Sequence, residues 1–180
     1  MILPLDEQDA VQADFLIDMF NHPDAHMFWG TGNRKYKTLG ELLSTFNAQL
    51  GFYKIFISYL GNVPSGIFVA HSISIKNHRA ELMAVISKGC RGKPIILSWW
   101  IEFLLELGHI GIKRIFAKVY AYNTHMLDSA KYAGFRQCGT LPDYVCYNGQ
   151  IYDTMLFTRT IELTPIEKRW QNKQIAKQQH

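Results

Sequence analysis

The sequence predicts one mixed α/β domain built around a β-sheet. Three successive segments rich in aromatic and β-branched residues, joined by short turns, indicate an antiparallel meander. A long apolar helix and a further strand follow the meander, which is typical of an α/β protein. The length of 180 residues and the 48% apolar composition suffice for the core of a single domain.

The N-terminal part is expected to form a short strand and two helices. Residues 1–5 have the composition of a strand, and a helix over 6–22 ends before a proline, because that position avoids helical backbone. Thr38 and Glu41 have the spacing of a capping box, which predicts a second helix that ends at Gly51.

The middle of the chain is expected to supply most of the sheet. Strands are predicted over 52–60, 66–75 and 79–87, and again over 113–121. A helix over 94–108 begins at a proline, whose missing N–H the first helical turn does not need. The helix is apolar apart from one narrow stripe, so we expect it to be deeply buried. The stripe consists of Ser98, Glu102 and Glu106.

The C-terminal part completes the sheet. Asn123 is expected to cap a helix over 124–133 that a glycine ends. Two last strands, over 135–141 and 150–159, are predicted to be joined by a loop that contains Asn148-Gly149.

The composition excludes several classes of protein. The apolar content excludes a disordered chain, and no apolar run reaches the length of a membrane span. Three scattered cysteines form no CxxC pair, so neither a disulfide framework nor a metal site is predicted. No signal peptide is visible, which favours a reducing, cytoplasmic setting.

The net charge of +4 is concentrated in a C-terminal tail over 164–180 that follows a domain over 1–163. A nearly neutral body argues against nucleic-acid binding, which usually needs a basic face across the domain. The tail is either a solvated basic segment or a short helix that docks on a protein partner through Trp170. Its charged residues are Lys168, Arg169, Lys173 and Lys177 against Glu167.

The loop before the long helix carries the first functional signal. Arg91 and Lys93 lie beside the free N–H groups of a helix N-terminus, an arrangement that binds phosphates. A solvated turn with two basic residues is the alternative interpretation of this loop alone.

An ordered set of segments resembles the GNAT superfamily of acetyl-CoA-dependent N-acetyltransferases. Spacing and order match from about 52 to 160, and the N-terminal helices agree in type only. The matching segments are Ala80–Ser87, Arg91–Lys93, Gly111–Ile115, Asn123–Met126 and Ala133–Phe135. The segment Tyr147–Asp153 is similar to the ribosomal-protein N-terminal acetyltransferase branch.

The resemblance implies a fold, a cofactor site and a reaction. The sheet would carry helices on both faces, and acetyl-CoA would bind between the strands 79–87 and 113–121. Glu81 would deprotonate a primary amine, either a protein N-terminus or a small amine, which then attacks the thioester. The implied cofactor-binding residues are Val85, Ser87, Arg91, Gly92, Lys93, Ile95, Ile96 and Asn123.

The resemblance also implies an acceptor site in the loop between the first two helices. Phe28, Trp29 and Tyr36 would shape that site, and aromatic packing under the loop is the alternative. No membrane partner is expected.

Two departures from the family pattern bear on activity. Pro94 and Ile96 stand where the family's phosphate loop has glycines, which predicts weaker acetyl-CoA binding. Ala130 stands where many members place a tyrosine that protonates the leaving thiolate. The alternative interpretation is a GNAT-fold protein without catalysis that serves as an interaction module, for example as an internal virion component of a tailed phage.

Overall fold

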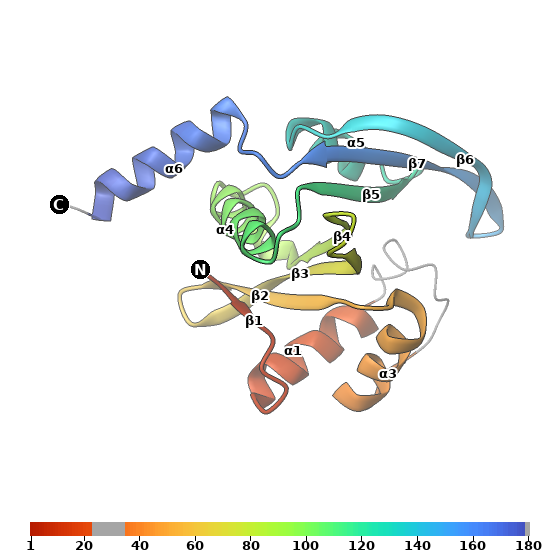
Figure 1. The fold of residues 1–180 in the computed structure, drawn as a ribbon. Coiled ribbons are helices and arrows are strands. Elements are labelled where there is room, and N and C mark those ends of the chain that lie inside the picture. Colours follow the sequence, from red (N-terminus) through yellow and green to blue (C-terminus); the bar gives the residue numbers. More distant parts are fainter. Residues whose placement is uncertain (23–34, 179–180) are drawn as a thin grey trace.

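Seven strands form a single sheet in the order β1-β2-β3-β4-β5-β7-β6 in the computed structural model, which describes residues 1–22 and 35–178 (Figure 1). The strands are β1 (Ile2–Pro4), β2 (Lys54–Leu60), β3 (Val63–Ser74), β4 (Arg79–Ile86), β5 (Arg114–Tyr120), β6 (Arg136–Tyr147) and β7 (Gln150–Thr160). The helices are α1 (Ala10–Asn21), α3 (Leu39–Leu50), α4 (Ile95–His109), α5 (Thr124–Tyr132), α6 (Pro165–Gln178) and the short 3₁₀ helix η2 (Lys88–Cys90). No helix among these residues is long and apolar enough to cross a bilayer.

Most predicted helix ends are confirmed, but α1 begins at Ala10 and not at the expected residue 6. The Asp9 side chain accepts hydrogen bonds from the first amides of α1, and Thr38 accepts one from the amide of Glu41 at the start of α3. Gly51 ends α3 with a φ of 62°, a left-handed conformation that glycine adopts without strain. Asn123 caps α5, accepting from the amide of Met126.

Two hydrophobic cores lie on opposite faces of the sheet, which confirms the mixed α/β architecture with helices on both faces. The helices α1 and α3 cover one face, with Phe46 and Ile57 among the fully buried residues (Figure 1). On the other face α4 packs its Trp99 and Phe103 against the sheet. The buried position of α4 agrees with its thin polar stripe.

The link between the last two strands differs from the prediction. Residues 142–147 were expected in a loop, but β6 continues to Tyr147 and pairs with the start of β7. The turn itself is only Asn148-Gly149, with φ values of 50° and 77°. Both residues adopt the left-handed conformation that a two-residue hairpin turn requires. An irregularity between Leu141 and Val145 lets the long hairpin bend.

The C-terminal tail forms α6, whose first turns pack against α4 and whose end points away from the domain (Figure 1). Trp170 is partly buried and donates a hydrogen bond from Nε1 to Ser98 Oγ at 2.8 Å. The Trp170 side chain therefore packs against α4 within the domain, which differs from an anchor that is exposed for a protein partner.

Candidate functional site

The strands β4 and β5 pair over only half of their length. They are the sheet's parallel neighbours, and they pair from Arg79 with Arg114 to Leu82 with Ala117. Beyond that point β4 stays paired with β3 up to Ile86, and β5 stays paired with β7 up to Tyr120. The two strands therefore diverge, and the edge of β4 over 83–86 has no strand beside it. Backbone groups on such an edge are available to an extended ligand.

Glu81 and Lys118 meet at the point of divergence. Lys118 Nζ lies 3.2 Å from Glu81 Oε2, with the Glu81 side chain 29% exposed and that of Lys118 46% exposed. Glu81 is opposite Phe116 in the register, and Lys118 is two residues beyond Phe116. Because alternate residues share a face, both side chains project from the face that α1 and α3 cover.

His71 of β3 is the third titratable group at this point, opposite Glu81 in the β3–β4 register. Burial lowers the pKa of His71, the carboxylate of Glu81 raises it in part, and the charge of Lys118 lowers it further. The net effect is a lowered pKa, so His71 is neutral at pH 7.

The loop after β4 satisfies part of its own backbone. The amide of Lys93 donates to Cys90 O, and that of Ile96 donates to Lys93 O. Arg91 Nε donates to Ile86 O at 3.0 Å, which ties this side chain to the end of β4. Gly92 has a φ of 75°, a conformation that glycine adopts without the strain that a side chain would add. The amides of Lys93 and Ile96 are therefore engaged within the chain and are not free to bind a phosphate group.

The remaining predicted cofactor residues lie around the diverging strands. Val85 is buried in β4, while the amide of Ser87 donates to Ser65 O at 3.0 Å. Ile95 and Ile96 begin α4 and pack against the core beneath it. Asn123 is buried after the end of β5, where its Oδ1 is engaged as a helix cap.

These residues fit acetyl-CoA in part. The unpaired edge of β4 suits the amides of a pantetheine arm, which can add to a strand edge. The basic loop suits a pyrophosphate through Lys93, which is exposed. Pro94 has no N–H to offer, and the engaged amides weaken this end of the site.

The structure describes one of the three predicted acceptor residues, so the acceptor site stays a prediction. Phe28 and Trp29 lie outside the described residues. Tyr36 is buried in the α1–α3 core, and its backbone exchanges two hydrogen bonds with the side chain of Asn21, each 2.7 Å long. Tyr36 is therefore a buried packing residue, which is the alternative interpretation that the sequence left open.

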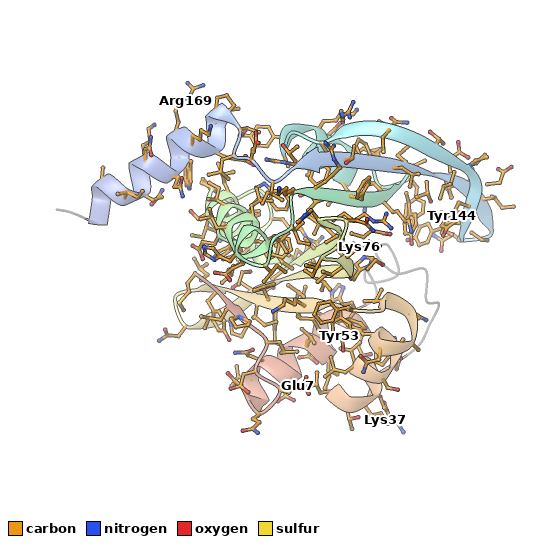
Figure 2. All side chains as sticks on the ribbon, viewed as in Figure 1. Glu7, Lys37, Tyr53, Lys76, Tyr144 and Arg169 are labelled. Atoms are coloured by element: carbon orange, nitrogen blue, oxygen red, sulfur yellow. The ribbon has the colours of Figure 1, made fainter. Side chains whose placement is uncertain are left out.

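A cluster of tyrosines near the end of β5 was missed by sequence reasoning. The ring of Tyr122 stacks on Tyr147 at 4.5 Å and on Tyr120 at 5.5 Å, and Tyr152 meets it edge-on at 5.0 Å. Burial and the neighbouring tyrosines raise the pKa of Tyr122 to about 12, and its hydroxyl has no partner among the described residues. Tyr144 lies near the end of the β6–β7 hairpin, which also carries Tyr147 and Tyr152 (Figure 2). The sequence indicates this cluster only by the high frequency of tyrosines between residues 120 and 152. The pairing of β6 with β7 is what brings their rings into contact.

The comparisons with known proteins identify the fold. No protein-family model and no curated sequence matches the chain. A spermidine N-acetyltransferase from Vibrio cholerae, solved with CoA and spermine, is 16% identical with a TM-score of 0.75, over 89% of this chain and 94% of that one. A ribosomal-protein-alanine N-acetyltransferase from Brucella melitensis is 18% identical with a TM-score of 0.68, over 89% and 99%. An N-acetyltransferase from Staphylococcus aureus is 16% identical with a TM-score of 0.71, over 90% and 98%.

These neighbours show that the chain has the GNAT fold, as the sequence resemblance implied. At these identities the likeness concerns the fold alone. Nothing in the comparisons supports the alternative of a virion component.

Proposed function

We propose that the protein transfers an acetyl group from acetyl-CoA to a primary amine. The observation that carries the proposal is the carboxylate of Glu81 at the point where β4 and β5 diverge. A base at that point lies beside the only stretch of β4 whose edge is open toward β5 among the described residues. The neighbour from Vibrio cholerae, which has the same fold, is described with CoA and spermine.

The residues around the gap have separate binding roles in this proposal. The β4 edge near Val85 and Ser87 holds the pantetheine arm through backbone groups, and Arg91, Gly92 and Lys93 receive the pyrophosphate. The start of α4 at Ile95 and Ile96 closes the loop, and Asn123 supports the arm from the β5 side. When bound, acetyl-CoA supplies an activated acyl carbon joined to a sulfur leaving group.

Glu81 acts as the general base. Its carboxylate is half-buried and ion-paired, so it stays in place to accept a proton from the acceptor nitrogen. Removing that proton makes the nitrogen a nucleophile. The neutral imidazole of His71 stands next to Glu81 and is the second group able to accept a proton there.

The acceptor approaches from the face that carries Glu81, Lys118 and Tyr120, which alternate along β4 and β5. The tyrosine cluster begins at Tyr120 and forms an apolar wall with hydroxyl groups on this side. Both a protein N-terminus and a small amine are compatible with such a wall.

The test is amine-dependent release of CoA thiol. We expect Glu81→Gln to slow the release by about 100-fold or more while the protein stays folded. Glu106→Gln is the matched control, because Glu106 is ion-paired with His109 on the exposed side of α4. Release by the wild-type protein that Glu81→Gln leaves unchanged would remove Glu81 from the mechanism and make His71 the next base to test. No release with any primary amine would contradict the function itself.

A further inference from the structure

The site lacks the tyrosine that many proteins of this fold use toward the leaving sulfur. Ala130 occupies the corresponding position, and its methyl group is buried in the core on the α4 face. It can neither donate a proton nor stabilise a charge. The leaving sulfur of the proposed reaction therefore needs another group.

Lys118 is the cation placed to meet that need. It is the first β5 residue beyond the paired segment, so its backbone lies where the two strands begin to diverge. Its ammonium group reaches Glu81 at 3.2 Å and is still 46% exposed, which leaves it room for a second anion. Glu81 alone would repel a sulfur that gains negative charge, and the adjacent cation offsets this repulsion.

We propose that the ammonium group of Lys118 stabilises the sulfur of CoA as it leaves as a thiolate. This inference rests on the proposed acetyl transfer. The acceptor nitrogen forms a bond to the acyl carbon, the carbon–sulfur bond breaks, and the sulfur keeps the electron pair. Glu81 passes the first proton of the acceptor ammonium to water. It then takes the second proton as the nitrogen becomes an amide and returns that proton to the sulfur, so the Glu81–Lys118 pair regains its starting charges.

The test is a titration of the thiol of bound CoA, followed by the ultraviolet absorbance of the thiolate. The absorbance change of the same titration with desulfo-CoA, which has no thiol, is subtracted. That change comes only from the protein's own tyrosines and cysteines. Among the described residues, Glu81, His71 and Tyr120 are titratable groups on the same face as Lys118, and the subtraction removes their contribution as well.

Lys118→Met keeps the length of the side chain without its charge. We expect the thiol pKa of bound CoA to rise by about one unit or more in this variant, and the rate of transfer to fall by about tenfold or more. Lys118→Arg should retain most of both properties. Lys131→Met is the matched control, because it removes a lysine from an exposed ion pair with Asp128 on α5.

The outcomes separate this inference from the proposed function. An unchanged thiol pKa in Lys118→Met, with CoA bound, would overturn the role of Lys118 and leave the acetyl transfer standing. Failure of the wild-type protein to bind CoA would overturn both.

Discussion

Arg159 and Glu167 form a buried, bidentate ion pair between β7 and α6. Their side chains are 4% and 3% exposed, and the two contacts measure 2.9 and 3.1 Å. Glu167 also accepts from Trp100 Nε1 at 2.7 Å and from the amide of Thr164 at 2.6 Å. This many donors favour the carboxylate of Glu167 over its protonated form.

The ion pair predicts a pH-dependent stability. Burial raises the pKa of Glu167, but the hydrogen bonds from Arg159 and Thr164 and the charge of Arg159 outweigh burial, so the pKa lies below its ordinary value of 4.5. The pair's contribution is therefore complete above that value and is lost as the pH falls through the lower, folded pKa.

We expect Glu167→Gln to lower the free energy of unfolding by about 3–5 kcal/mol at pH 7, because Arg159 is left buried and unpaired. The difference from wild type should shrink as the solution is acidified, which urea unfolding at several pH values will show. Asp128→Asn, which breaks an exposed pair, should change stability little at any pH. A difference that stays constant down to strongly acidic pH would contradict the assignment of the charge to Glu167.

At the scale of the elements, α6 divides into an anchored start and an outer end. Glu167 and Trp170 attach its first turns to Arg159 and to Ser98 of α4. Farther along, Lys173 and Ile175 are exposed. Figure 2 shows Arg169 on the outer side of α6, away from the domain. A partner that binds the exposed basic side of α6 remains a prediction.

Two truncations test this division. Ending the chain after Leu163 removes Glu167 and Trp170, so we expect a markedly lower melting temperature or an unfolded protein. Ending it after Asn172 removes only the outer end of α6, and we expect nearly unchanged melting. Equal melting of both truncated proteins would show that the buried pair contributes little to stability.

At the scale of the whole molecule, local patterns predicted most elements and few of the contacts between distant ones. Capping residues and β-branched runs act on their neighbours in sequence, which is why Thr38, Gly51 and Asn123 were interpreted correctly. The strand that replaced the loop over 142–147 depends on pairing with β7, which short-range propensity does not contain.

The candidate site shows the same contrast between local patterns, which the sequence contains, and contacts between distant elements, which it does not. The ordered motifs predicted the fold, which the structure confirms. The cofactor site that they predicted between β4 and β5 stays a prediction. The sequence alone did not indicate the contacts of Lys118 with Glu81 and of Tyr122 with Tyr147. These contacts form only when the strands pair in the sheet. Glu167 was counted with the solvated tail because its partner, Arg159, lies in another element.

The central claim is that the diverging part of β4 and β5 binds acetyl-CoA, and a titration followed by amide NMR tests it most directly. We expect acetyl-CoA to shift the amide signals of residues 83–87, of Lys93 and of residues 118–120, with small effects in β1 and β2. We expect weak binding, with a Kd of about 10 μM to 1 mM, because Pro94 and the engaged loop amides reduce the contacts to phosphate. Unshifted amides over 83–87 at about millimolar acetyl-CoA, or shifts confined to other strands, would show that acetyl-CoA does not bind between β4 and β5.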